Sequence, residues 1–256
     1  MSSAHKHTLA LLILLALAAC APQATSTPTP FAAYVGTTPA YDQWVEGWVQ
    51  VYWEQEPGNG VTPLVYPPEA ALDALDDSEI ELLITASTPP QGWFATRLQG
   101  DAIAILVDPD LSIDELDLDQ LYDIFHGRTE NWDELGGDDQ VIQPIIPLQG
   151  DEIRTLFQTR VLQGTRYTSN ALLAPHPSAA LELVEGKPGA IALIPWTAVP
   201  SDRVALRVEG VLPSFTSIES GRYALTLDLL AIAPEEPIGA MRQFLGWLQA
   251  TLLSES

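Results

Sequence analysis

Two turns with adjacent hydroxyl-bearing residues offer the clearest potential for chemistry in this chain. Thr37 and Thr38 follow the apolar segment 31–35, and Ser87 and Thr88 follow the end of a second apolar segment. At strand ends, hydroxyls and backbone N–H groups can converge on a small polar ligand and hold it by hydrogen bonds. Ser and Thr also stabilise ordinary turns and helix starts, so a purely structural role is equally open. The chemistry indicated is binding.

A third segment, 147–154, reads PLQGDEIR and places two acids at the start of a predicted helix. Asp151 and Glu152 stand where side chains cap free helix N–H groups and interact favourably with the helix dipole. Simple N-capping is one interpretation, and two carboxylates that face a cationic or amine ligand are the other. Both oppose an anionic ligand, since like unit charges about 4 Å apart repel by about 4 kcal/mol at an effective dielectric of about 20.

No pattern in the sequence supports catalysis or a metal site. G-x-S-x-G, S-x-x-K, Walker and Rossmann motifs are absent from it. The acids between Asp108 and Asp119 are spaced as in a calcium loop, but Ile113 stands where that loop needs glycine. His126 and His176 have no partner at helical spacing. We therefore expect no catalytic residue, no metal and no cofactor.

The charge of the chain excludes several kinds of partner. Its 256 residues include 11 Lys and Arg against 34 Asp and Glu, for a formal net charge of −23. A field of that sign repels phosphate backbones and anionic lipid headgroups, so we expect neither nucleic-acid binding nor electrostatic membrane docking. The length and the 46% apolar content suit one large domain or two lobes with real cores. The single cysteine, Cys20, allows no intrachain disulfide.

The first thirty residues are typical of an export and anchoring segment. Lys6 precedes an uninterrupted apolar run over 9–19, too short to span a bilayer with ordinary flanks, and the run ends in L-A-A-C. That ending resembles the lipobox of bacterial lipoproteins, which implies removal of the signal peptide 1–19 and lipidation of Cys20. A plain signal peptide with an incidental cysteine is the alternative. Residues 20–30, rich in Pro and Thr, would form an extended tether on the outer face of a bacterial cell membrane.

Hydrophobic periodicity predicts an α/β fold. In the first third of the chain, apolar strands alternate with helices through short connections, an order that favours a parallel sheet. The expected strands are 31–35, 63–66, 81–86, 102–107, 140–146, 190–194 and 223–233, and the expected helices are 41–55, 68–77, 154–162, 178–184 and 239–253. Ser112 and Glu115 predict a capping box for one more helix, which ends near Phe125.

Segment 102–137, AIAILVDPDLSIDELDLDQLYDIFHGRTENWDELGG, resembles the PstS-like phosphate-binding solute receptors of ABC transporters. That family carries an apolar strand followed by L-T-x-x-Q-L-x-x-I-F-x-G-x-x-x-N-W-x-x-L-G-G. Further matches are Pro-Gly-Ala-Ile at 188–191, Ser-Gly-Arg-Tyr at 220–223 and Phe-Leu-Gly-Trp-Leu at 244–248. Each motif is weak alone, but their shared order and spacing over 31–252 are specific for the fold.

The resemblance implies a two-lobed type II periplasmic-binding-protein-like fold with two hinge crossovers and an interlobe cleft. Lobe 1 would comprise 31–107 and 200–256, and lobe 2 would comprise 108–199. Helix N-termini and strand-to-helix turns from both lobes would point N–H groups into the cleft, and hinge closure would bury the ligand. The implied ligand-binding residues are Thr37, Thr38, Ser87, Thr88, Gln149, Gly150, Asp151 and Arg154.

The ligand loop of lobe 2 departs from the family pattern R-x-x-G-S-G-T. With the loops aligned on Gly150, the Arg of the family becomes Pro147. The Ser, Gly and Thr become Asp151, Glu152 and Ile153. A charged fork and several oxyanion donors are therefore lost, and we expect phosphate to be disfavoured as the ligand.

These features together predict a membrane-anchored extracytoplasmic solute-binding protein that is a monomer. It would deliver a small polar solute to an ABC permease and have no enzymatic activity. The alternative is a non-transporting ligand sensor or partner-binding lipoprotein that reuses the fold. The degenerate loop favours the alternative, and neighbouring permease genes would favour transport.

Overall fold

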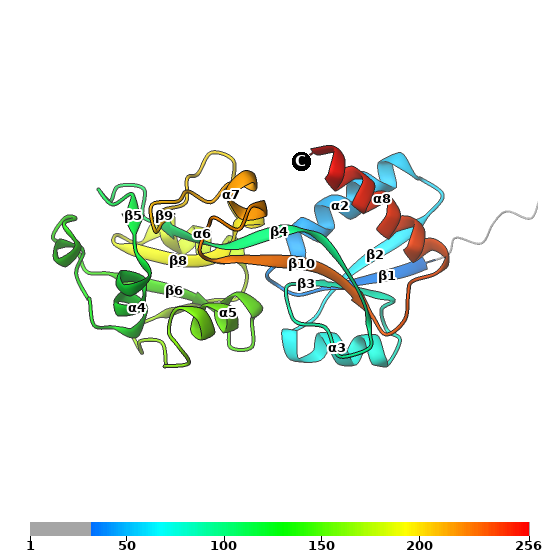
Figure 1. The fold of residues 1–256 in the computed structure, drawn as a ribbon, viewed down its shortest axis with the longest axis horizontal. Helices are drawn as coiled ribbons and strands as arrows, with labels where there is room; N and C mark the ends of the chain where they lie inside the picture. Colours follow the sequence, from blue (N-terminus) through cyan, green and yellow to red (C-terminus); the bar gives the residue numbers. More distant parts are fainter. Residues whose placement is uncertain (1–31, 256) are drawn as a thin grey trace, which may run out of the picture. The chain divides into compact units, whose positions relative to one another are not determined.

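An eight-stranded sheet runs through residues 32–255, which are the residues that the computed structural model describes (Figure 1). The strand order is β2-β1-β3-β10-β4-β8-β6-β7. Its strands are β1 (Ala32–Thr37), β2 (Gly60–Val65), β3 (Leu82–Thr85), β4 (Phe94–Val107), β6 (Gln143–Pro147), β7 (Leu172–Ala174), β8 (Ala190–Pro195) and β10 (Thr226–Ala233). The signal peptide, Cys20 and the tether predicted above lie outside the described residues.

Both ends of the sheet are parallel, and its middle is antiparallel. At one end β1 pairs in parallel with β2 and β3, and at the other end β6 pairs in parallel with β7 and β8. Between them, β10 pairs antiparallel with β3 and β4, and β4 pairs antiparallel with β8. Short crossover helices feed the parallel strands, so the predicted α/β class is confirmed.

Strand β4 joins the two halves of the sheet, beside β10 (Figure 1). Residues 94–102 of β4 pair with β10, whereas residues 103–107 pair with β8. Strand β10 in turn pairs with β3 through residues 230–232. One long strand and its antiparallel neighbour therefore link a half that contains β1–β3, called lobe 1 below, to a half that contains β6–β8, called lobe 2. This is the predicted two-lobed arrangement.

The segment that precedes β10 packs on lobe 2. Strand β9 (Arg207–Val208) pairs in parallel with β5 (Glu115–Leu116), in a separate two-stranded ribbon. The Leu206 N–H donates to the Ile105 carbonyl at 2.8 Å, and the Tyr223 hydroxyl donates to the Ile103 carbonyl at 3.0 Å. These contacts favour a second crossover at β10, later than the predicted limit at residue 200. The lobe limits 31–107 plus 200–256 and 108–199 stay predictions.

Helices cover both faces of each half of the sheet, because alternate strand residues point to opposite faces. In lobe 1, Leu82 and Ile84 of β3 pack beneath α2 and α8, whereas Leu83 packs with α3. In lobe 2, α4 and α5 share one face and α6 covers the other. The helices are α2 (Asp42–Gln55), α3 (Pro68–Asp76), α4 (Leu118–His126), α5 (Glu152–Arg160), α6 (Pro177–Gly186), α7 (Phe215–Glu219) and α8 (Gly239–Glu255), with short 3₁₀ turns at Trp132–Leu135 and Trp196–Ala198.

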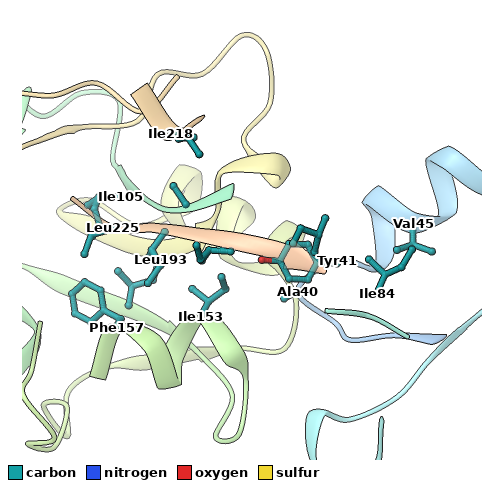
Figure 2. Packing of buried hydrophobic residues seen from close by; sticks show 14 of the residues in the cluster. Ala40, Tyr41, Val45, Ile84, Ile105, Ile153, Phe157, Leu193, Ile218 and Leu225 are labelled. Carbon is teal, nitrogen blue, oxygen red and sulfur yellow. The ribbon is translucent and has the colours of Figure 1, made fainter. Parts of the chain in front are cut away.

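One hydrophobic cluster continues from lobe 1 into lobe 2 (Figure 2). Val45 of α2 and Ile84 of β3 belong to it in lobe 1, and Phe157 of α5 and Leu193 of β8 belong to it in lobe 2. All four side chains are essentially buried, and burial of such a side chain contributes about 1.5–3 kcal/mol. Both lobes therefore stabilise the strands that pass between them.

The predicted start of one helix is wrong. Ser112 and Glu115 form no capping box, since Glu115 lies in β5 and α4 begins later, at Leu118. The cap is Asp117, whose carboxylate accepts from the Gln120 N–H at 2.7 Å, while the Gln120 side chain accepts from the Asp117 N–H at 2.9 Å. The sequence pattern of Ser112 and Glu115 resembles that of Asp117 and Gln120. Because Glu115 pairs with the distant strand β9, the helix starts at the second pattern.

Candidate functional site

A carboxylate at the start of α5 reaches from lobe 2 into lobe 1. The Glu152 Oε1 atom accepts hydrogen bonds from the Thr38 hydroxyl at 2.9 Å, the Thr85 hydroxyl at 3.0 Å and the Ala86 N–H at 3.2 Å. Glu152 is only 4% exposed, and both threonines are 1% exposed. Three donors of lobe 1 therefore converge on one oxygen atom of lobe 2, at a buried point between the lobes.

The parallel pairing of β1 with β3 creates this set of donors. Thr37 is the last residue of β1 and is paired with Ile84, one residue before the end of β3. Thr38 follows β1 directly, and Thr85 ends β3, so both hydroxyls lie at the same edge of the sheet. The Thr37 hydroxyl donates to the Ile84 carbonyl at 3.2 Å and thus ties the two strands together.

Asp151 caps α5, as the N-capping interpretation predicts. Its Oδ1 atom accepts from the Ile153 N–H at 2.9 Å and from the Arg154 N–H at 3.4 Å. These are the donors that a helix N-terminus would otherwise present to an anion. Burial, together with the neighbouring charge of Glu152, raises the pKa of the Asp151 carboxyl to about 7. The electrostatic environment therefore disfavours added negative charge.

The Arg154 side chain turns back onto lobe 2. Its Nη1 atom donates to the Pro147 carbonyl at 3.0 Å, and its guanidinium lies 5.2 Å from the centroid of the Tyr167 ring. Within residues 32–255, neither Asp151 nor Glu152 takes part in an ion pair. The charged fork that an oxyanion receptor needs is therefore not directed at Glu152.

Tyr41 and Asp101 add two buried polar groups near this point. Figure 2 shows Tyr41, at the start of α2, with its hydroxyl directed towards the lobe 2 side of the cluster, where Ile153 lies. That hydroxyl has no hydrogen-bond partner in the described part of the chain, and burial and the charge of Asp101 raise its pKa. Asp101 accepts from the Thr197 N–H at 3.0 Å and from the Thr197 hydroxyl at 3.1 Å. Burial raises the pKa of Asp101 to about 6.

Among the described residues, none of the other predicted site residues forms a hydrogen bond with the Glu152 carboxylate. The Ser87 N–H donates to the Thr85 hydroxyl at 3.1 Å, which orients that hydroxyl. Thr88 and Gln149 are exposed. Gly150, also exposed, has a φ of 89°, a left-handed conformation that suits glycine. The three predicted segments thus meet as expected, and their role in binding a ligand stays a prediction.

Sequence reasoning missed two of the three donors. Thr85 is the last residue of an apolar strand, and the apolar pattern assigns it to that strand and not to the hydroxyl turn that follows. Ala86 contributes only its backbone N–H, which no side-chain pattern reveals. A polar residue at the carboxyl end of a buried parallel strand was the one available signal.

A family match covers residues 24–251 and is described as a PBP superfamily domain. This chain belongs to the PBP superfamily. It is 26% identical to the phosphate-binding protein PstS of Bacillus subtilis (strain 168) over 155 residues, which make up 60% of this chain and 51% of that protein. The match thus spans about half the length of that curated relative. The predicted PstS-like resemblance is confirmed.

Solved structures share the fold of this PBP superfamily member. A putative phosphate ABC transporter substrate-binding protein with bound phosphate from Clostridium perfringens matches with a TM-score of 0.80 at 20% identity, over 88% of this chain and 97% of that one. An ABC-type phosphate transport receptor from Vibrio cholerae matches with a TM-score of 0.69 at 20% identity, over 87% of this chain and 97% of that one. The CcmR regulatory domain of Synechocystis PCC6803 in complex with 2-PG matches with a TM-score of 0.61 at 11% identity, over 86% of this chain and 97% of that one. These likenesses confirm the predicted fold class.

Proposed function

We propose that this chain is the solute-binding component of an ABC transporter, held on the outer face of a bacterial cell membrane by a lipid on Cys20. Membership of the PBP superfamily supports the class, as do relatives named as phosphate-binding and substrate-binding proteins. The observation that carries the proposal is the meeting of Thr38, Thr85 and Ala86 of lobe 1 with the start of α5 from lobe 2. Receptors of this architecture bind solute where turns from both lobes converge.

The charges at this point favour a small polar solute that is neutral or cationic over phosphate. Asp101, Asp151 and Glu152 are all buried, and none of them forms an ion pair within the described chain. A phosphate would add negative charge there, and each like-charge contact at about 4 Å opposes binding by about 4 kcal/mol at an effective dielectric of about 20. An ammonium group would instead be attracted by these carboxylates, and a neutral solute would meet no such repulsion.

A non-transporting sensor or partner-binding lipoprotein is the second candidate. It is favoured by one specific observation, that Glu152 already satisfies all three lobe 1 donors. A transport receptor must empty this point to admit a solute, whereas a partner-binding protein can leave it filled. The fold itself is compatible with this role, since a regulatory domain is among its structural neighbours.

A thermal-shift screen of the purified protein against phosphate, sugars, amino acids and polyamines tests the proposal. A solute at tenfold excess over its Kd should add about 1.4 kcal/mol to the free energy of unfolding. Stabilisation by a neutral or cationic solute supports the solute-binding function, and stabilisation by phosphate contradicts the proposed ligand class. If no solute stabilises the protein and cross-linking in native membranes captures no permease, the second candidate is favoured.

A further inference from the structure

Glu152 stands where an external anion would be expected to stand. Two hydroxyl donors and one backbone N–H, from the carboxyl ends of the neighbouring strands β1 and β3, all donate to its Oε1 atom within 3.2 Å. Backbone N–H groups and hydroxyls at strand ends are the groups that hold small anions in proteins. We call Thr38, Thr85 and Ala86 the lobe 1 turn set. Its donors are satisfied by a side chain that lies 114 residues from Thr38 in the sequence.

The backbone of Glu152 is fixed from both sides. Asp151 before it caps α5, and Ile153 after it is fully buried in the cluster that joins the lobes. The carboxylate can therefore leave the lobe 1 turn set only by rotation of its side chain or by separation of the lobes. Since the donors and the acceptor belong to different lobes, their hydrogen bonds hold the lobes together.

The contact satisfies only one of the two carboxylate oxygens. The Oε2 atom of Glu152 is buried and has no hydrogen-bond partner in the part of the chain that the structure describes. Buried polar atoms are normally hydrogen-bonded. The carboxylate of Glu152 therefore departs from the norm, because its Oε1 atom accepts three hydrogen bonds and its Oε2 atom accepts none from the described residues. Glu152 therefore fills the site with an incomplete set of hydrogen-bond partners, and a ligand that pairs more completely could compete with it.

We propose that Glu152 is a tethered internal ligand: its carboxylate fills the lobe 1 turn set and latches the two lobes closed in the absence of solute. This inference goes beyond the proposed function, because it concerns the group that occupies the lobe 1 turn set. It does not depend on the identity of the solute or of the permease. It also defines a ligand class. A turn set emptied of Glu152 should accept a small monocarboxylate, which reproduces the lost group, in preference to phosphate, which would bring more charge beside Asp151 and Asp101.

Chemical rescue of Glu152→Ala tests the latch. The variant removes the carboxylate and leaves the three donors in place, so formate or acetate should bind there and stabilise the folded protein. At tenfold excess over its Kd, the carboxylate should raise the folded-to-unfolded ratio about tenfold. Sodium chloride at equal ionic strength serves as the salt control. The matched variant is Glu182→Ala, which removes an exposed glutamate from α6 in the same lobe.

Formate or acetate should stabilise Glu152→Ala and leave the wild-type protein and Glu182→Ala unchanged. A folded Glu152→Ala variant that gains nothing from either carboxylate would overturn the proposal, as would equal stabilisation of all three proteins. Stronger stabilisation of the variant by phosphate than by acetate would overturn the proposed ligand class.

Should Glu152→Ala fail to fold, amide hydrogen exchange at Ala86 in the solute-free wild-type protein decides the question. Among the described residues, Glu152 is the acceptor of the Ala86 N–H. The latch predicts that this amide exchanges at least about a hundredfold more slowly than in a free peptide, because exchange requires the Glu152 side chain to rotate away or the lobes to separate. Exchange at the free-peptide rate would show that the turn set is open and the latch absent.

Discussion

Replacement of Asp151 by asparagine should remove much of the pH dependence of stability. Burial and the charge of Glu152 raise the pKa of Asp151 from 3.8 to about 7 in the folded protein. The folded state thus binds this proton more tightly than the unfolded state. The contribution of the protonated Asp151 to the free energy of unfolding is fully present below about pH 3.8 and is lost as the pH rises to about 7. Between about pH 5 and about pH 8, the loss through Asp151 amounts to about 2.6 kcal/mol of unfolding free energy. Asp101, with its pKa raised to about 6, adds a smaller loss in the same direction.

Asparagine keeps the capping function of position 151, because it is as good an N-cap as aspartate. Asp151→Asn should therefore fold, retain most of the stability of the wild-type protein near pH 5, and lose less on the way to pH 8. Urea unfolding at several pH values, analysed with one common slope of free energy against urea concentration, measures the free energy of unfolding of both proteins. The matched control is Asp117→Asn, which changes the exposed N-cap of α4 and should leave the wild-type pH dependence unchanged. If Asp151→Asn loses as much stability as the wild-type protein over this range, the buried-carboxyl explanation is refuted.

Three further predictions concern the site and the anchor. Thr85→Val should lower the free energy of unfolding by about 1.5–3 kcal/mol, the range for a hydrogen bond to a charged group, and Thr85→Ser should restore most of it; urea unfolding that finds Val and Thr equally stable would contradict the contact with Glu152. Phosphate at millimolar concentration should give the wild-type protein no measurable stabilisation, and calorimetry that finds micromolar binding would show that the lobe 2 loop does not oppose anions. Cys20→Ala should release the protein from the membrane fraction or leave it uncleaved, and fractionation and processing identical to the wild type would eliminate the lipid anchor.

Local sequence predicted the regular elements wherever apolar residues alone decide them. The buried run in β8 and the amphipathic repeat of α2 were both located within a residue or two. Strand β4 was predicted only from residue 102, although it begins at Phe94. Its first part carries polar side chains such as Arg97, which pairs with Glu219 and Asp228 on neighbouring segments. A strand whose polar residues have distant partners shows no continuous apolar run in the sequence. Strand β9 was not predicted for a related reason, because its partner β5 lies far away in the sequence.

Some components of the site were predictable from the sequence, but two of the three donors and the central contact were not. The residue type of Asp151 and its place before a helix favour N-capping, one of the two interpretations, and the structure confirms it. The hydrogen bond from Thr38 to Glu152 joins residues 114 positions apart, and no local rule links them. The substituted loop did indicate that an external anion is disfavoured. That one of the substituted residues itself takes the place of the anion follows only from the three-dimensional arrangement.

Small-angle X-ray scattering from the solute-free wild-type protein and Glu152→Ala tests most directly whether this carboxylate closes the receptor. The wild-type curve should match that calculated from the structure in which Glu152 contacts the lobe 1 turn set, and Glu152→Ala should give a larger radius of gyration that returns to the wild-type value when acetate is added. A folded Glu152→Ala variant with a curve identical to that of the wild-type protein would contradict the claim.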